Sequence, residues 1–246
     1  MWNALVLIVT TFALGGEFAA WRRRRPFRLR AAAPVRVYEA VIGAVRVRVV
    51  LTGIGQRAAT AAAAAVFADR PDVCISAGWA GALCEPLRAS DVVAPDDVRG
   101  ADGRTIEADP SLLALAVRCG AMAIGTLYSA PDIVVTAAQK RQLSVLAEAV
   151  DMESSTILEE SRRRGVAAVA IRAISDLASM DLPVDLNQAL RADGRVSVVR
   201  TILAVARRPR AIPGLVRLAA DSRRAARALA TVLDAYVERA SCHQRS

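Results

Sequence analysis

Residues 45–68 read VRVRVVLTGIGQRAATAAAAAVFA, and this stretch decides the fold class of the chain. Its first part, Val45–Leu51, is rich in valine and is typical of a β-strand. The alanine-rich part, Gln56–Ala68, is typical of a helix because alanine has the highest helix propensity. Gly53-Ile54-Gly55 lies between them, so the stretch predicts a strand, a tight turn and a helix, which is the repeating unit of an α/β fold.

The same alternation of strand-like and helix-like segments continues along the chain. Short runs rich in β-branched residues are separated by segments of helix length, one of which, Ser154–Arg164, ends at Gly165. A chain of 246 residues that is 54% apolar is long enough to bury one substantial core, so we predict a single α/β domain. The further predicted strands are Val6–Thr10, Val73–Ser76, Asp91–Ala94, Ala123–Leu127 and Ala167–Ile171.

The apolar run Ala4–Leu14 contains the first of these strands. It spans about a dozen residues, fewer than the roughly 20 that a membrane-crossing helix needs, and no basic segment precedes it. We therefore expect a buried strand. The alternative is a start that contacts a membrane through the arginines that follow.

The formal charge of +9 comes almost wholly from arginine, because Lys140 is the only lysine. The arginines concentrate in two regions, Arg22–Arg30 and Arg195–Arg227, and those of the second region stand among apolar residues. A stretch that is both basic and apolar is typical of a surface for anionic lipid, nucleic acid or an acidic partner. The alternative is a solvated helix face.

Histidine and cysteine are too few and too scattered for two large classes of chemistry. The four cysteines form no CxxC pair and the only histidine is His243, so neither a zinc site nor histidine-dependent nucleophilic catalysis is expected. The cysteine spacing fits a reducing cytoplasm better than a disulfide framework. Acid–base chemistry must therefore fall to carboxylates, and no motif calls for a metal or an organic cofactor.

Two segments of small residues are expected at the ends of neighbouring strands. Gly53 and Gly55 would let backbone N–H groups approach an anion or a ribose hydroxyl. Ser76-Ala77-Gly78 leads to Trp79, whose ring could stack on a base or a sugar. Tight packing explains the glycines equally well, and Trp79 equally fits a packing role.

Two segments that carry carboxylates occur at similar points later in the chain. Asp151-Met152-Glu153 leads into a helix, where acids ordinarily cap the helix and interact with its dipole. Ile174-Ser175-Asp176 directly follows a buried strand, where an aspartate is ordinarily a turn or cap residue. Taken separately, neither segment indicates catalysis.

The order of four motifs, however, resembles the nucleoside phosphorylase and nucleosidase superfamily. The four are Thr52-Gly53-Ile54-Gly55, Ser76-Ala77-Gly78-Trp79-Ala80-Gly81, Asp151-Met152-Glu153 and Ile171-Arg172-Ala173-Ile174-Ser175-Asp176. The last two make the likeness closest to the branch of methylthioadenosine/S-adenosylhomocysteine nucleosidases. The resemblance implies a three-layer fold in which helices flank a central mixed, mostly parallel sheet, with residues 1–194 as the catalytic domain.

Segments beyond residue 180 are similar to the hopanoid-associated phosphorylase family. They are Asp181–Asn187, Ala192–Arg195, Arg207–Pro209 and Asp221–Leu229. Members of that family are assigned to removing adenine from adenosylhopane, a nucleoside with a polycyclic hydrocarbon on its 5′ carbon. Residues 195–240 are then expected to form an arginine-rich extension of two helices, broken near Pro209–Pro213, that packs on the domain and faces a membrane.

The resemblance also implies roles for three carboxylates. Asp176 would be the general acid that protonates N7 of the purine, with a pKa raised by a water-poor pocket. Glu153 would stay ionised and bind the ribose hydroxyls, which stabilises the cationic transition state. Glu17 lies where nucleosidases carry a glutamate that helps to activate water, the alternative being the start of a surface helix.

Other site residues follow from the same likeness. Met152 would lie against the ribose face, and Ile133 and Val134 would lie near the adenine. Arg172 would either assist the acid electrostatically or form a buried structural ion pair. Trp79 is larger than the residue usual at that point in nucleosidases of soluble substrates, so it would reshape the sugar side of the pocket. Because adenosylhopane carries a bulky hydrocarbon on its 5′ carbon, we expect a pocket that is open on that side and apolar at its mouth.

Several alternatives stay open at this point. The attacking nucleophile is water or inorganic phosphate as a co-substrate. The substrate is a lipid-linked nucleoside or a soluble one such as methylthioadenosine, S-adenosylhomocysteine or futalosine, and a catalytically silent membrane-associated binding protein of the same fold is the remaining alternative. We expect a cytoplasmic homodimer that contacts the inner face of the cytoplasmic membrane and binds no nucleic acid.

Overall fold

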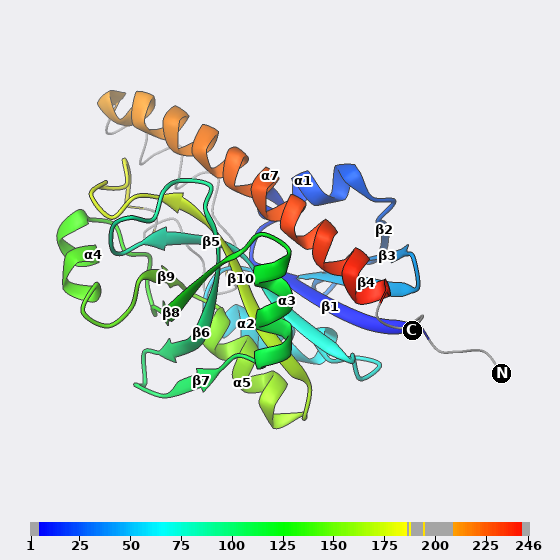
Figure 1. Ribbon diagram of the computed structural model, residues 1–246. Helices are drawn as coiled ribbons and strands as arrows, with labels where there is room; N and C mark the ends of the chain where they lie inside the picture. Colours follow the sequence, from blue (N-terminus) through cyan, green and yellow to red (C-terminus); the bar gives the residue numbers. More distant parts are fainter. Residues whose placement is uncertain (1–4, 186, 188–193, 195–208, 243–246) are drawn as a thin grey trace.

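The computed structural model describes residues 5–185, 187, 194 and 209–242, and within them ten strands form one sheet (Figure 1). The strands are β1 (Val6–Phe12), β2 (Arg28–Ala31), β3 (Arg36–Ile42), β4 (Val45–Leu51), β5 (Val73–Ala82), β6 (Val92–Gly100), β7 (Thr105–Glu107), β8 (Met122–Ser129), β9 (Ala149–Asp151) and β10 (Ala167–Asp176). The helices are α1 (Gly15–Arg24), α2 (Gln56–Val66), α3 (Pro110–Arg118), α4 (Ala137–Leu143), α5 (Ser154–Arg163) and α7 (Ile212–Cys242), the last preceded by the short turn η2 (Pro209–Ala211).

The centre of the sheet is built from parallel pairings. β1 pairs in parallel with β4 and β5, and β5 pairs in parallel with β10, from Val73 opposite Ala167 to Gly81 opposite Asp176. The sheet also closes on itself, because β10 pairs with β6, β6 with β8, β8 with β9, and β9 with β5. β5 therefore belongs both to a ring of five strands and to the open sheet that continues through β1 to β4, β3 and β2.

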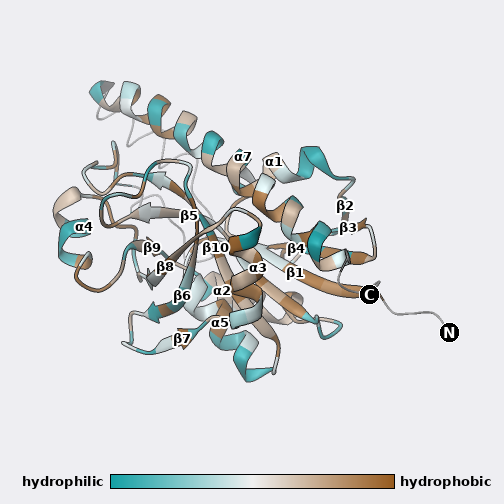
Figure 2. Cartoon of the chain, in the orientation of Figure 1, coloured by the Kyte–Doolittle hydropathy of each residue, from teal (hydrophilic) through white to brown (hydrophobic). Residues whose placement is uncertain are grey.

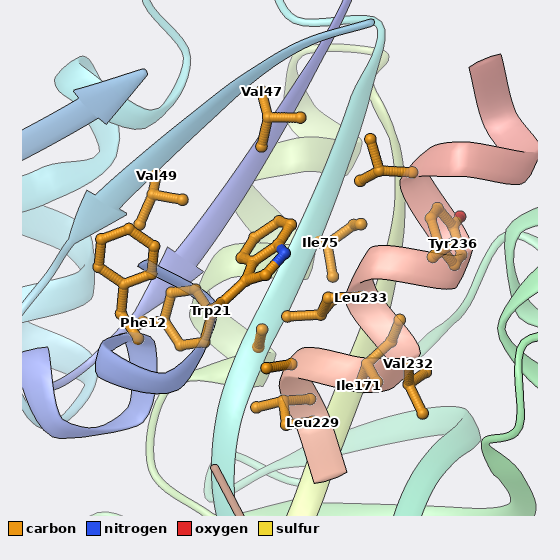
Figure 3. Close-up of a cluster of buried hydrophobic side chains, with 14 of the residues drawn as sticks. Phe12, Trp21, Val47, Val49, Ile75, Ile171, Leu229, Val232, Leu233 and Tyr236 are labelled. Atoms are coloured by element: carbon orange, nitrogen blue, oxygen red, sulfur yellow. The ribbon is translucent and has the colours of Figure 1, made fainter. Parts of the chain in front are cut away.

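Helices cover both faces of the sheet. On one face, α1, α3 and α7 pack against the strands, and Figure 3 shows Leu229 and Leu233 of α7 beside Ile75 of β5 and Ile171 of β10. On the other face, alanine and aliphatic side chains of α2 and α5 pack against the sheet. The layers are held together mainly by this burial of apolar surface.

A polar link fixes α7 against α1. The indole N–H of Trp21 donates to the carboxylate of Asp234 at 2.6 Å, and Nε of Arg25 donates to the same oxygen at 2.9 Å. Trp21 itself is fully buried beside Phe12 and Phe18. The second half of α7 is therefore part of the main core.

The first turns of α7 differ from the rest of the helix. They extend past the edge of the sheet (Figure 1) and expose Ile212 and Val216 at 48% and 65%. Hydrophilic and hydrophobic residues alternate along the helix (Figure 2), and no helix in the described part of the chain is long and apolar enough to cross a membrane. The first of the two helices predicted after residue 194 lies outside the described residues, and the boundary at residue 194 stays a prediction.

The predicted fold class is confirmed, and all six predicted strands occur. Five of them are longer than predicted, and for the site the important extensions are those of β5 to Ala82 and of β10 to Asp176. The segment Ser76–Gly81, which was predicted to lie at the end of a strand that stops at Ser76, is therefore itself strand, and that predicted end was wrong. Both strands continue because they pair with each other in parallel and because β9 pairs with the end of β5. The sequence does not predict β2, β3, β7 or β9.

Replacing Leu233 by alanine tests the packing of α7. The side chain is fully buried against the sheet, so its loss should lower the free energy of unfolding by about 2–5 kcal/mol. Val216→Ala, on the exposed part of the same helix, should change it by less than about 0.5 kcal/mol. Urea unfolding followed by circular dichroism measures both values, and equal effects would contradict the described position of α7.

Candidate active site

A cavity of about 240 Å³ opens where the parallel strands end at their carboxyl termini. This is the edge of a parallel sheet at which ligands ordinarily bind. Its wall consists of Ala13, Leu14, Glu17, Ile54, Trp79, Ala80, Gly81, Asp132, Ile133, Val134, Val150, Asp151, Met152, Glu153, Ser175, Asp176, Leu182, Leu218 and Ser222. The last two come from α7, so this helix contributes both to the core and to the cavity.

A buried ion pair joins β10 to β9 beside the cavity. Nη2 of Arg172 lies 2.6 Å from Oδ2 of Asp151, and neither side chain is more than 1% exposed. The guanidinium also donates to the hydroxyls of Ser76 on β5 and Ser154 on α5, at 2.9 and 2.8 Å. Through these contacts Arg172 ties β10, β9, β5 and α5 together beside the cavity.

Glu17 lies in the first turn of α1 but is buried, at 5% exposure. Its carboxylate accepts the backbone N–H groups of Leu14 at 2.7 Å and Trp79 at 2.8 Å. Burial raises the pKa of this group, while the two backbone hydrogen bonds and the charge of Arg172 oppose the rise. A Cβ atom at Gly78 would lie 2.7 Å from Glu17 and 2.2 Å from Arg172, so the close approach of these groups requires glycine there.

Glu153 accepts the backbone N–H of Gly55 at 2.7 Å. Burial and, next, the negative charge of Asp151 raise the pKa of Glu153 to about 8, although Arg172 opposes the rise. Burial is the largest cause of this rise, and the single buried arginine that Glu153 shares with Glu17 and Asp151 offsets it only in part. That Glu153 is ionised during the reaction stays a prediction. Within the described residues, no group of three or more His, Cys, Asp or Glu could hold a metal ion.

Asp176 ends β10 on the cavity wall and is 8% exposed. One carboxylate oxygen accepts the hydroxyl of Ser175 at 2.7 Å, and the other accepts Nζ of Lys140 at 2.5 Å. Lys140 lies on α4 and is fully buried. The two donors fix the orientation of the Asp176 carboxyl group.

A family model described as the phosphorylase superfamily matches residues 7–208. The chain belongs to the phosphorylase superfamily. The match begins within β1 and ends before α7, so it includes every residue of the cavity wall except Leu218 and Ser222.

Solved structures that are similar to this chain include two nucleosidases and a hydrolase. Helicobacter pylori 5′-methylthioadenosine/S-adenosylhomocysteine nucleosidase has 18% identity and a TM-score of 0.75, over 96% of this chain and 100% of that one. The Neisseria meningitidis nucleosidase of the same name has 20% identity and a TM-score of 0.74, also over 96% and 100%. Futalosine hydrolase of Helicobacter pylori has 18% identity and a TM-score of 0.74, over 96% and 98%. At these identities the likeness shows the fold.

Seven of the predicted site residues lie on the cavity wall. They are Glu17, Trp79, Ile133, Val134, Met152, Glu153 and Asp176. The other six, which lie outside the wall, are Gly53, Gly55, Ser76, Ala77, Gly78 and Arg172. Gly55, Gly78 and Arg172 touch or approach the buried carboxylates instead, and Arg172 forms the structural ion pair that was its alternative role. Direct contact of these six residues with a substrate stays a prediction.

Sequence reasoning missed Lys140 and the two wall residues of α7. Lys140 carried one signal, since it is the only lysine of an arginine-rich chain. Leu218 and Ser222 carried none, because they reach the cavity from a helix far along the chain that only the tertiary fold brings there.

Glu153→Gln tests the raised pKa. A carboxyl group with a pKa near 8 in the folded protein and 4.5 when unfolded makes the wild type lose stability as the pH rises from about 4.5 to 8. Glutamine cannot ionise, so at pH 8 the variant should be more stable than the wild type by on the order of 2 kcal/mol, with little difference at pH 5. Urea unfolding at both pH values measures this, with the exposed Glu107→Gln as the control. A variant that is less stable at pH 8 would contradict the shift.

Proposed function

We propose that the chain cleaves the N-glycosidic bond of an adenine nucleoside. The observation that carries this proposal is a cavity whose wall holds four buried carboxyl groups. Asp151 is paired with Arg172, and the other three lie in three different environments. Glu17 is held by two backbone N–H groups, Glu153 by one, and Asp176 by a hydroxyl and an ammonium. Cleavage places positive charge on the sugar and negative charge on the base, so it needs carboxyl groups in different protonation states.

The proposed roles follow from these environments. Asp176 first takes up a proton from solvent and then donates it to N7 of the purine, which leaves as a neutral base. Glu153, with one oxygen held by the backbone N–H of Gly55, accepts hydrogen bonds from the ribose hydroxyls, and its negative charge stabilises the sugar as it becomes cationic. Glu17 accepts a proton from the attacking water, and Met152 packs against the ribose.

Water, rather than inorganic phosphate, is the nucleophile in this proposal. Five acidic residues stand on the cavity wall, namely Glu17, Asp132, Asp151, Glu153 and Asp176, and no basic residue of the described part of the chain is on it. Binding of a phosphate dianion needs cationic side chains or free N–H groups that point at it. The nearest buried cations, Arg172 and Lys140, are already paired with carboxylates.

For the substrate, we propose a nucleoside with a bulky apolar group on its 5′ carbon, as in adenosylhopane. The sequence resemblance to the hopanoid-associated family supports this choice. So do the apolar residues on the wall near α1, α2 and α7, namely Leu14, Ile54, Leu182 and Leu218. A soluble nucleoside of the methylthioadenosine type is the second candidate, favoured by the shared fold of the solved nucleosidases.

We also propose that α7 brings the cavity to an anionic membrane. Its first turns expose Ile212 and Val216, and the same part of the chain exposes Arg210, Arg217 and Arg224. Apolar side chains beside arginines are typical of a helix that lies in a lipid headgroup region. The expected location is the inner face of the cytoplasmic membrane, and association as a dimer stays a prediction.

Adenine release is the experiment that tests the reaction. Purified protein is incubated with adenosylhopane in liposomes, and separately with methylthioadenosine, each with and without phosphate, and free adenine is measured by chromatography. We expect release from the lipid substrate at a rate that phosphate does not change. Asp176→Asn should lower the turnover by about two to four powers of ten. The control Asp102→Asn removes an exposed carboxylate that is not on the cavity wall and should leave turnover near that of the wild type.

The other outcomes of this experiment are equally informative. Release from methylthioadenosine alone would identify a soluble nucleosidase and contradict the lipid substrate. Release that requires phosphate would contradict water as the nucleophile. No release from either substrate would favour a binding protein that has lost the chemistry of its fold.

Flotation with vesicles tests the membrane contact. Wild-type protein should float with phosphatidylglycerol vesicles and stay behind with phosphatidylcholine vesicles, because the attraction is partly electrostatic. Ile212→Glu with Val216→Glu should abolish flotation. Val41→Glu is the control, because Val41 is 58% exposed on β3, away from the first turns of α7. Equal flotation of both variants would contradict the proposed surface.

A further inference from the structure

The only lysine of the chain is also one of its most buried charged residues. The Lys140 side chain is 1% exposed, whereas Arg141, next to it on α4, is exposed. Burying an ammonium group is costly unless its charge is paired and its N–H groups are satisfied. The short helix α4, of seven residues, therefore carries in Lys140 a buried ammonium group that needs a specific partner.

All three hydrogens of this ammonium have acceptors. Nζ lies 2.5 Å from Oδ2 of Asp176, 2.7 Å from the carbonyl oxygen of Leu177 and 3.0 Å from that of Met180. Lysine offers three donors around one nitrogen, which matches one carboxylate and two carbonyls that converge on a point. The planar fork of arginine, the cation used everywhere else in this chain, has a different geometry.

The same contacts fix Asp176 from one side. Ser175 holds its other oxygen at 2.7 Å, and a Cβ atom at Gly81 would lie 3.1 Å from Oδ2, so the carboxyl group has little room to turn. The carbonyl contacts at Leu177 and Met180 also hold the chain that follows β10 against α4. Lys140 thus determines where the carboxyl group of Asp176 points.

The ammonium also matters for charge during the proposed reaction. When Asp176 gives its proton to N7 of the base, the O–H bond breaks, the N–H bond forms, and a carboxylate remains on Asp176. That negative charge develops 2.5 Å from Nζ of a buried cation, where water screens the attraction weakly. A fixed charge of this kind stabilises the transition state without reorganisation.

We propose that Lys140 is a positioning residue that acts through Asp176, orienting its carboxyl group toward the base and stabilising the carboxylate left by proton transfer. This inference rests on the proposed function, because it assumes that Asp176 is the general acid. It predicts that Lys140 matters only for substrates whose leaving group needs a proton.

Lys140→Met tests the inference with two leaving groups. With the adenine nucleoside that the wild type cleaves, kcat should fall by about 10- to 100-fold while KM changes little. With 4-nitrophenyl riboside, whose phenolate leaves without a proton, kcat should stay near that of the wild type. Arg141→Met is the matched control and should leave both rates unchanged. If Lys140→Met does not fold, Lys140→Gln, which keeps two N–H donors without the charge, carries the same expectation.

A double-substitution cycle separates this role from a purely structural one. In an Asp176→Asn background, Lys140→Met should cause no further loss of adenine release, because the two residues act as a unit. Equal losses with both leaving groups, or additive losses in the cycle, would overturn the inference. Absence of adenine release by the wild type would instead overturn the proposed function, so the two failures are distinguishable.

Discussion

The buried ion pair between Arg172 and Asp151 is the interaction on which the site depends. It connects β10 to β9, and its hydroxyl partners add β5 and α5. Burial and then the charge of Asp151 raise the pKa of Glu153 to about 8, and the charge of Arg172 opposes this rise. Replacing Arg172 would leave uncompensated negative charge in the core, so the same interaction holds the fold and tunes the chemistry.

The site therefore uses two buried cations in different ways. Arg172 pairs with Asp151 at the end of β9 and also donates to the hydroxyls of Ser76 and Ser154, whereas Lys140 pairs with Asp176 at the end of β10 and also donates to two backbone carbonyls. Both cations lie outside the wall itself, so within the described part of the chain the charged residues on the wall are all acidic. A cavity of this kind favours a sugar that becomes positive and disfavours an anionic nucleophile.

Much of the fold follows from local patterns in the sequence. The valine-rich and alanine-rich parts of residues 45–68 predict β4 and α2 because burial and helix propensity act within one segment. The continuation of β5 and β10 beyond their predicted ends depends on pairing between strands almost 100 residues apart, which no local pattern reports. Likewise Glu17 and Asp176 were recognised through a family resemblance, while Leu218 reached the cavity only through tertiary packing.

The position of α7 has a consequence for synthesis of the protein. All ten strands precede residue 212, so they leave the ribosome before the helix that covers Ile75 and Ile171. Until that helix arrives, the nascent sheet presents a bare apolar face of the kind that chaperones bind and that neighbouring chains adhere to. The cavity also lacks its Leu218 side during this time. Maturation of the site and protection of the sheet are thus completed in one late docking event.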